Sequence, residues 1–330
     1  MATGKPVLVI GSLNMDLVAR CEHLPRTGQS VFGTDFFTAP GGKGANQAVA
    51  AARLGARVTM AGCVGNDQFG HELVVGLQRD GVRCDFVRTV TRPTGTALIT
   101  IDGQGANTIV VISGANTACD ETLVDSALTG ADAPGILLLQ HEIPGEANAH
   151  AIRAARAAGW IIVLNPAPAL PVAPALLPLI DVIAPNETEA EALTGSNDPR
   201  EAARRLLKQG ARAALITLGE EGALYCDADR ALHCPAIAVQ AVDTTAAGDA
   251  YLGALAASLA EGHGVTDSLG FAGAAAGLAV TRLGAQPSLG TREEVTAFIE
   301  QSGGRHSPVI AGASPADETG PNSAMSQGRP

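Results

Sequence analysis

Residues 136–165 read ILLLQHEIPGEANAHAIRAARAAGWIIVLN, with a short apolar run at each end and an alanine-rich stretch between. The apolar runs are typical of buried strands, and the alanine-rich stretch has helical spacing. Further strand-like runs are Val7–Ile10, 58–61, 182–184 and 213–218, again separated mostly by alanine-rich stretches. This alternation predicts an α/β fold with a mainly parallel sheet flanked by helices.

Two segments interrupt the alternation, at about residues 13–40 and 93–112. Both are rich in β-branched residues and turn signals, such as TALITI at 96–101 followed by Asp102 and Gly103. They predict a small separate β-sheet. From about residue 303 to 330, Gly, Ser, Pro and Asn dominate without apolar periodicity, which is typical of a flexible tail. We therefore expect one domain over residues 1–302.

Composition excludes several classes of protein. The 330 residues are 46% hydrophobic and 17% charged, as in globular proteins, and the net charge of -11 disfavours nucleic-acid binding. The first apolar run is too short for a signal peptide or a membrane span. Six scattered cysteines form no CxxC pair, which indicates reduced thiols. We expect a soluble cytoplasmic protein with no nucleic-acid or membrane partner.

Polar residues follow several of the predicted strands. They are Asn14, Asp16, Glu142, Asn165 and Asn186. The carboxyl ends of parallel strands meet at one edge of a sheet, where ligands bind in open α/β folds. The alternative for any single Asn or Asp is a helix cap, although Glu is not a favoured cap. Together they predict a polar crevice.

A glycine-rich loop, GGKGAN at residues 41–46, precedes an alanine-rich helix that ends near Gly55. A helix N-terminus offers free N–H groups and a positive dipole end, the glycines permit close approach, and Lys43 adds charge. A tight turn alone would explain the glycines but not Lys43 and Asn46. The loop is therefore a candidate ligand site.

A second candidate is DTTAAGD at residues 243–249, which leads into a small-residue helix over 250–260. The amides of Ala246, Ala247 and Gly248 could bind a transferring phosphoryl group while Asp249 accepts a proton from an attacking hydroxyl. The alternative is that Asp243 or Asp249 only caps the helix.

A third motif, NETEAE at residues 186–191, could hold Mg²⁺ through its water ligands, or could simply favour the helix dipole. The chain has no GxxxxGK[ST] loop and no GxGxxG after its first strand, which disfavours P-loop and dinucleotide-binding enzymes. His71-Glu72 and His141-Glu142 each lack the second histidine of a zinc motif.

Together these segments resemble the ribokinase family of carbohydrate kinases, which also contains adenosine kinase and the minor phosphofructokinase. The resemblance covers about residues 5–300, and its most specific part is 243–253. Finer matches at 11–16, 41–47, 165–168, 186–191 and 284–288 favour ribose over nucleosides as acceptor. The resemblance implies a doubly wound sheet with a small β-sheet lid formed by 13–40 and 93–112, and homodimerisation through that lid.

The resemblance also implies a role for each matching residue. Asp249 is the expected base for phosphorylation of D-ribose at O5 by ATP, with Ala246, Ala247 and Gly248 as the anion hole. The expected sugar ligands are Asn14, Asp16, Gly42, Lys43, Asn46, Glu142 and Asp249. The expected residues for ATP and Mg²⁺ are Asn186, Glu189, Thr217, Gly219, Gly222, Gly248 and Gly273. The expected K⁺ site comprises Asp243, Thr245, Ala279, Arg282, Gly284 and Ser288.

Three alternatives remain at this point. One is a kinase for 2-deoxyribose, another sugar or a nucleoside, since Pro40 and the segment 250–252 depart from the family pattern. Another is a non-catalytic sugar-binding protein, which predicts loss of the base or the anion pocket. A nicotinamide-dependent dehydrogenase is disfavoured because the dinucleotide motif is missing.

Overall fold

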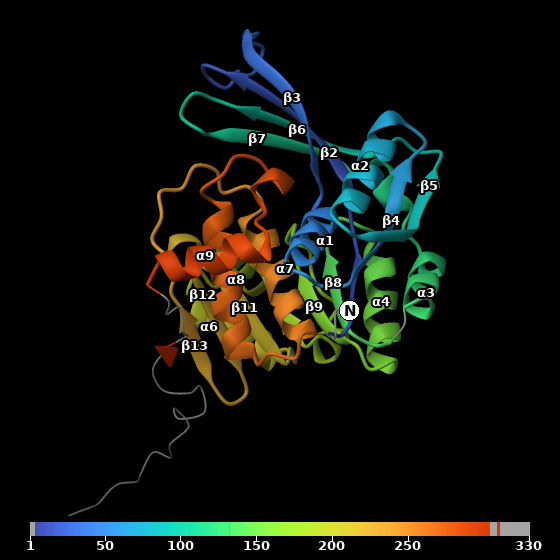
Figure 1. The fold of residues 1–330 in the computed structure, drawn as a ribbon, viewed down its shortest axis with the longest axis vertical. Helices are drawn as coiled ribbons and strands as arrows, with labels where there is room; N and C mark the ends of the chain where they lie inside the picture. Colours follow the sequence, from blue (N-terminus) through green and yellow to red (C-terminus); the bar gives the residue numbers. More distant parts are fainter. Residues whose placement is uncertain (1–3, 132, 304–308, 311–330) are drawn as a thin grey trace, which may run out of the picture.

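The computed structural model describes residues 4–131, 133–303 and 309–310 (Figure 1). Within them, two sheets account for the strands, and helices pack on the larger one. The larger sheet has the order β14 (Val309–Ile310), β13 (Ala231–Cys234), β12 (Ala223–Asp227), β11 (Ala213–Thr217), β10 (Val182–Ile183), β9 (Ile161–Asn165), β8 (Ile136–Gln140), β1 (Val7–Ile10), β4 (Val58–Gly65) and β5 (Arg83–Val90).

The seven strands from β11 through β10, β9, β8, β1 and β4 to β5 pair in parallel. Strands β1, β4 and β8 are buried throughout, which matches their continuous apolar runs. Beyond β11, strands β12, β13 and β14 add in antiparallel fashion. The expectation of a mainly parallel sheet is confirmed.

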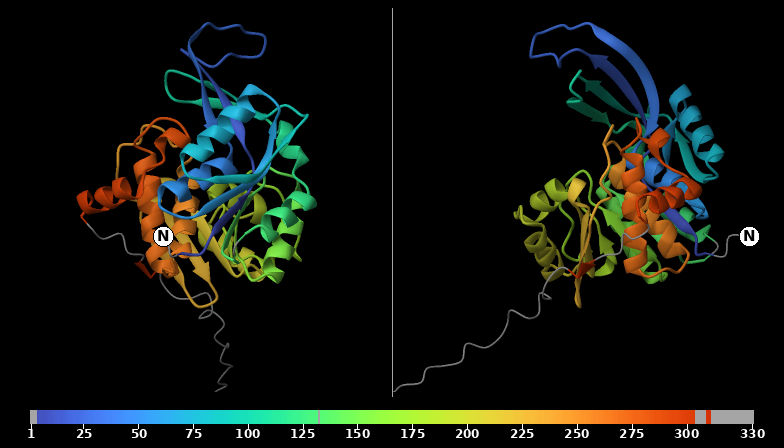
Figure 2. Two further views of the ribbon diagram at one scale, coloured as in Figure 1. Left: turned by 45° about the vertical axis from the view of Figure 1, so that its right-hand side comes forward. Right: turned by 60° about the vertical axis from the view of Figure 1, so that its left-hand side comes forward.

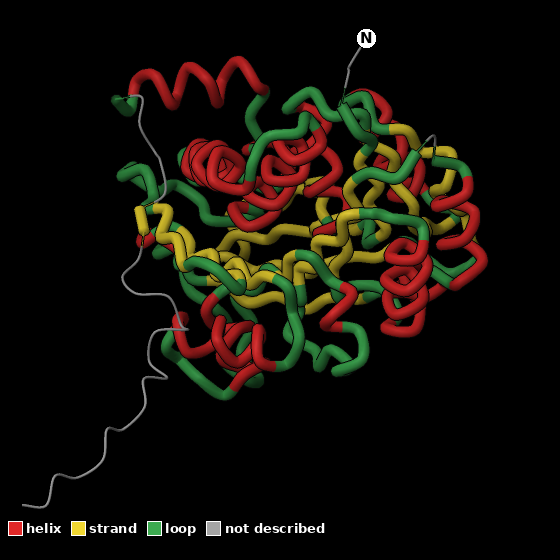
Figure 3. Tube along the Cα trace, turned by 90° about the horizontal axis from the view of Figure 1, so that it is seen from below, coloured by secondary structure: helices red, strands yellow, loops and turns green. Residues whose placement is uncertain are grey.

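Helices cover both faces of this sheet, as Figure 3 shows. In β1, Val7 and Val9 join one core cluster, and Leu8 and Ile10 join the other. The first cluster includes side chains of α1 (Lys43–Arg53), α2 (Gln68–Arg79), α7 (Ala247–Ala260), α8 (Val265–Ala279) and α9 (Arg292–Gln301). The second includes those of α3 (Glu121–Thr129), α4 (Gly145–Ala157), α5 (Glu187–Thr194) and α6 (Pro199–Lys208).

The smaller sheet projects from one side of this layered body (Figures 1 and 2). Its order is β3 (Gly33–Gly41), β2 (Asn14–Cys21), β6 (Gly95–Ile101) and β7 (Asn107–Ile112). Strands β2 and β6 are parallel, whereas β2–β3 and β6–β7 are antiparallel. The two segments that interrupted the alternation therefore pair with each other, as predicted, and we call this sheet the lid.

Some boundaries and elements differ from the prediction. Helix α7 begins at Ala247 instead of residue 250, because small residues after Ala246 extend the first turn. Strands β5, β12 and β13 were not predicted. Strand β14 lies within the expected tail and pairs with β13, and the other residues after 303 lie outside the described part of the chain. No helix in the described ranges is long and apolar enough to span a membrane.

Candidate active site

The carboxyl ends of the central strands face the N-termini of α1 and α7. A cavity of about 210 Å³ lies between them. Its lining residues are Lys43, Asn165, Ala167, Ala184, Asn186, Glu189, Thr217, Thr244, Ala246, Ala247, Gly248, Asp249 and Leu252. The fold therefore brings together residues from all three predicted motifs.

Asp249 is a buried carboxylate at the wall of this cavity, with 6% of its surface exposed. One of its oxygens accepts a hydrogen bond from Asn46 Nδ2 at 2.9 Å and the other from Gln47 Nε2 at 3.0 Å. Burial raises the pKa of Asp249, although Lys43 and the two amides oppose the shift. Asp249 does not act as a helix cap, because both side-chain bonds go to α1. A raised pKa suits a general base.

The first turn of α7 presents backbone N–H groups to the cavity. Ala246 has a φ of 60°, and the Ala247 N–H donates to the Thr244 carbonyl at 3.3 Å. Within the described residues, the amides of Ala246 and Gly248 make no hydrogen bond. A Cβ at Gly248 would meet nothing within 4 Å. Of the three amides expected to form an anion hole, those of Ala246 and Gly248 therefore remain available in the described part of the chain, whereas the Ala247 amide is engaged.

The glycine-rich loop begins α1 and packs against the segment after β1. Gly42 has a φ of 89°, and a Cβ there would come within 2.7 Å of the Asn14 backbone nitrogen. Packing alone therefore requires this glycine. Lys43, by contrast, lines the cavity, and its pKa is raised because Asp249, Glu142 and Glu189 together outweigh the lowering effect of burial. The Lys43 ammonium group is therefore kept charged near Asp249.

Glu142 is anchored to the same helix N-terminus. Its Oε2 accepts from Ser12 Oγ at 2.5 Å and from the Lys43 N–H at 3.0 Å. A carboxylate here is favoured by the free amides and the helix dipole. Glu142 thus caps α1 from a distant part of the chain, although Glu is not a favoured cap residue.

Asp16 and Asn14 lie on β2 at the base of the lid. Burial, with Glu142 and Asp249 adding to it, raises the pKa of Asp16 to about 7. Its carboxylate packs on Gly41, where a Cβ would lie 2.4 Å from Asp16 Oδ2. Asn14 Oδ1 accepts from Asn116 Nδ2 at 2.7 Å, so its own amide N–H₂ is left to donate elsewhere. Asn14 and Asp16 are thus the expected sugar ligands that the lid contributes to the site.

A larger cavity of about 650 Å³ adjoins the first, sharing Thr217, Thr244, Ala247 and Gly248 with it. It is mostly apolar. Other lining residues include Gly219, Gly222, Ile237, Val239, Tyr251, Gly273 and Val280. Five residues expected to bind nucleotide therefore line one cavity: Thr217, Gly219, Gly222, Gly248 and Gly273. Its volume is in the range of ligand pockets.

Asn186 and Glu189 form a reciprocal capping box at the start of α5. Asn186 Oδ1 accepts from the Glu189 N–H at 2.8 Å, and Glu189 Oε2 accepts from the Asn186 N–H at 2.9 Å. The pair therefore stabilises the start of α5. Both residues nevertheless line the smaller cavity, and burial raises the pKa of Glu189. The other carboxylate oxygen of Glu189, Oε1, could accept a hydrogen bond from a ligand.

The loop before α7 meets the loop after α8 through Asp243. Asp243 Oδ1 accepts from Thr245 N and Oγ1 at 2.9 and 2.6 Å, and Oδ2 accepts from Gly284 N at 2.8 Å. Burial alone would raise the pKa of Asp243, but these hydrogen bonds lower it. The Ala279 carbonyl accepts from the Arg282 N–H, and Ser288 Oγ donates to the Ala285 carbonyl. Asp243 therefore joins the loop before α7 to the segment after α8; of the other predicted cation residues, Ala279 ends α8 and Ser288 lies in the short helix Gln286–Ser288.

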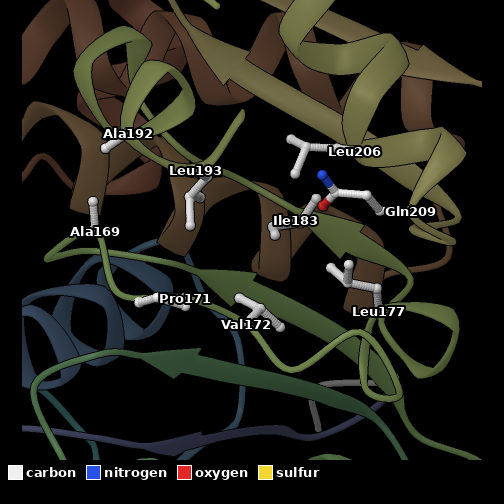
Figure 4. Close-up of a pocket in the computed structure, with 9 residues that line it drawn as sticks. All are labelled: Ala169, Pro171, Val172, Leu177, Ile183, Ala192, Leu193, Leu206 and Gln209. Carbon is white, nitrogen blue, oxygen red and sulfur yellow. The ribbon is translucent and has the colours of Figure 1, made fainter. Parts of the chain in front are cut away.

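Among the described residues, no group of three or more His, Cys, Asp or Glu side chains could hold a metal ion. Another cavity, of about 270 Å³, lies between α5, α6 and the loop after β9 (Figure 4). Its lining is apolar except for Gln209. None of the predicted site residues lines it, so it is not the candidate active site.

The matched family is consistent with this geometry. Residues 5–292 match the pfkB family carbohydrate kinase. The chain belongs to this family. The expected family resemblance, fold class and carbohydrate kinase class are thereby confirmed.

Individual members of the family are similar over nearly the whole kinase. A Bacillus subtilis ribokinase is 40% identical over 294 residues, covering 89% of this chain and 99% of that protein. A Salmonella typhi deoxyribokinase is 35% identical over 300 residues, covering 89% of this chain and 98% of that protein. The structure of Arabidopsis thaliana ribokinase complexed with ribose and ATP has a TM-score of 0.82 at 34% identity, and covers 90% of this kinase and 99% of that chain.

Several buried polar residues near the site were not predicted from the sequence. Ser12, Gln47, Asn116 and Gln140 are each at most 1% exposed. Ser12 and Gln47 lie within quoted motifs, so their position was a usable signal. Asn116 lies in the short helix Gly114–Ala118, and Gln140 ends β8. Nothing local distinguishes these two from ordinary loop and strand-end residues.

Proposed function

We propose that this kinase transfers the γ-phosphoryl group of ATP to O5 of D-ribose, giving D-ribose 5-phosphate and ADP. The observation that carries the proposal is the arrangement around Asp249. Asp249 is a buried carboxylate in the first turn of α7, and it lines a cavity that Lys43 also lines and that adjoins the larger cavity. The ribokinases among the relatives support ribose as the acceptor.

The sugar occupies the crevice between the lid and the N-terminus of α1. Its hydroxyls meet polar groups from Asn14, Asp16, Gly42, Lys43, Asn46 and Glu142. Asp249 accepts the proton of the O5 hydroxyl as that oxygen attacks the γ-phosphorus and the bond to ADP breaks. The proton ends on Asp249, and the N–H groups of Ala246 and Gly248 stabilise the charge on the transferring group.

ATP lies along the larger cavity, with its base against the apolar wall and its phosphates toward Gly248. Asn186 and Glu189 face the shared end, and oxygen ligands of this type suit Mg²⁺ held through water. Mg²⁺ bound there would neutralise phosphate charge. Lys43 keeps its own positive charge beside the γ-phosphoryl position.

A monovalent cation, K⁺, completes the proposal. The loops joined by Asp243 offer a carboxylate and the carbonyls of Thr245, Ala279, Arg282 and Gly284, a hard oxygen set that fits an alkali cation. The cation would fix the geometry of the loop that precedes the anion pocket. Replacing K⁺ by a bulky organic cation at constant ionic strength should lower turnover.

The lid has an exposed apolar surface that supports a homodimer. On one face of its strands the exposed apolar side chains include Phe36, Leu98, Val110 and Ile112, whereas Ile109 and Val111 lie on the opposite face. An exposed apolar face of this kind usually marks an interface. Two lids packing face to face would cover it and close over the sugar, excluding water from the reaction. Sedimentation of the full chain should give the mass of a dimer.

The cytoplasm is the proposed location. All six cysteines are free thiols in the structure, which suits a reducing compartment.

The deciding experiment measures ADP release with ATP, Mg²⁺ and K⁺ against ribose, 2-deoxyribose, fructose, adenosine and no acceptor. Ribose-dependent turnover well above the others is the expected result. A preference for 2-deoxyribose, which the similar deoxyribokinase makes the sharpest rival, would keep the mechanism and replace the substrate. A complete lack of turnover with every acceptor in the panel would overturn the proposal.

A further inference from the structure

The catalytic carboxylate is held by two consecutive side chains of one helix. Asn46 and Gln47 of α1 each donate to a different oxygen of Asp249, at 2.9 and 3.0 Å. Asn46 is also an expected sugar ligand, so its two roles cannot be separated by mutation. Gln47 has no exposed surface and does not line the cavity that Asp249 faces. Gln47 therefore contacts Asp249 from the protein interior and not from the cavity.

The direction of the Gln47 amide is fixed by its other neighbours. Its Oε1 accepts from Gln140 Nε2 at 2.7 Å, and its Nε2 also donates to Asn165 Oδ1 at 3.3 Å. Asn165 must present its oxygen, because its own Nδ2 donates to the Ala184 carbonyl at 2.9 Å. A flipped Gln47 would set oxygen against Asp249 and Asn165, and N–H₂ against N–H₂ of Gln140. Three contacts thus select the donor orientation.

We propose that Gln47 is a positioning residue for the kinase reaction, with Gln140 and Asn165 holding its amide so that the N–H₂ group always points at Asp249. The inference rests on the proposed role of Asp249 as base. Gln47 occupies one lone pair of Oδ1 and fixes the rotation of the carboxylate, which leaves the remaining lone pairs for the sugar hydroxyl. It also favours the ionised form, the form that can accept a proton.

Asp249 has other charged neighbours that influence its ionisation. Lys43 favours the charged form, and Glu142 disfavours it. Asp16 and Glu189 belong to the same cluster of interacting groups. None of these four is bonded to Gln47. A change confined to Gln47 therefore leaves the charged surroundings of the base in place.

The test compares Gln47→Met and Gln47→Glu with the wild type, over pH 5 to 9, using the sugar that the wild type phosphorylates best. Methionine keeps the volume but cannot donate. Glutamate keeps the acceptor for Gln140 and sets a second acid beside Asp249. We expect kcat to fall roughly 10-fold or more at pH 7, with the KM for sugar changing less than about threefold. The acid limb of kcat should move to higher pH by about one unit.

The control is Asn148→Ala. Asn148 is a buried amide of α4 whose Nδ2 donates to the Gln140 carbonyl at 2.7 Å, and its side chain does not touch Asp249. We expect this variant to lose thermal stability without moving the acid limb. Equal acid limbs in the wild type and both Gln47 variants would overturn the proposal and leave Gln47 as a packing residue.

A second readout does not depend on activity. The pKa of Asp249 is raised by folding, so its ionisation lowers stability as the pH rises from its unfolded value to its folded value. Gln47→Met should raise the folded pKa further. The deficit in Tm relative to wild type should therefore grow with pH, and this growth should vanish when both proteins also carry Asp249→Asn. Growth that persists without Asp249 would contradict the proposal, even if no sugar in the panel is phosphorylated.

Discussion

The site has two walls that hold their carboxylates differently: the floor, formed by α1 and the first turn of α7, and the lid. On the floor, both oxygens of Asp249 accept hydrogen bonds from buried amides of α1. On the lid, Asp16 accepts no hydrogen bond from any residue in the described ranges, and its pKa is raised to about 7. The floor is preorganised by the protein, whereas the lid carboxylate lacks partners that sugar hydroxyls could supply. This difference suits a base and a binding group respectively.

The largest expected effect is the loss of kcat when Asp249, on the floor of the site, is replaced. Asp249→Asn should lower kcat roughly 100-fold or more, because the amide cannot accept the hydroxyl proton. Sugar affinity should change little, since the lid and the N-terminus of α1 remain. Steady-state kinetics together with calorimetric titration of ribose would measure the two separately. Near-normal turnover would remove Asp249 from the role of base.

The next largest expected effect is the loss of ribose affinity when Asp16, on the lid, is replaced. Asp16→Ala should weaken ribose binding by roughly 10- to 100-fold, because charge-assisted hydrogen bonds to sugar hydroxyls are lost. The effect should appear in Kd and KM more than in kcat. Calorimetry at pH 8, where Asp16 is ionised, gives the clearest value. Unchanged affinity would place the sugar elsewhere in the crevice.

A smaller effect concerns stability in the absence of sugar. Since folding raises the pKa of Asp16 from 3.8 to about 7, stability contributed by this group is lost as the pH rises between those values. Asp16→Asn should therefore be more stable than the wild type at pH 8, by about 1–2 kcal/mol after allowance for partial exposure. The advantage should shrink toward pH 4. Urea denaturation at both pH values measures it, and a pH-independent difference would contradict the raised pKa.

The smallest expected effect is on the KM for ATP, in a Gly248 variant that should fold normally. At Gly248 an added Cβ meets no protein atom within 4 Å, so Gly248→Ala should fold normally and gain up to about 1 kcal/mol from its helical position. The methyl group would obstruct a phosphate approaching the amide. The KM for ATP should rise by about 10-fold while ribose affinity is retained. An unchanged KM would move the phosphates away from this turn.

Local sequence patterns were sufficient for most of the sheet and the helix starts. Apolar runs such as residues 136–139 predicted strands because a parallel strand is buried on both faces. Strand β5 was missed because its residues alternate between exposed and partly buried at the edge of the sheet. Strand β13 was missed because His233 interrupts its apolar run. Asp249 and the glycine-rich loop could be proposed from the sequence because each motif joins unusual residue types to a helix start.

Which side chains would bond which could not be derived from the sequence. Gln47 meets Asp249 across 202 positions and Gln140 across 93, and Asn116 meets Asn14 across 102. The order of residues therefore determined the strands, the helix starts and the residue types available for phosphoryl transfer. Only the tertiary structure decided which amides hold Asp249, that the Ala247 N–H is engaged, and that Asp16 accepts no hydrogen bond from the described residues. Those outcomes depend on burial and on the meeting of distant strand ends, and neither is a property of a local stretch of chain.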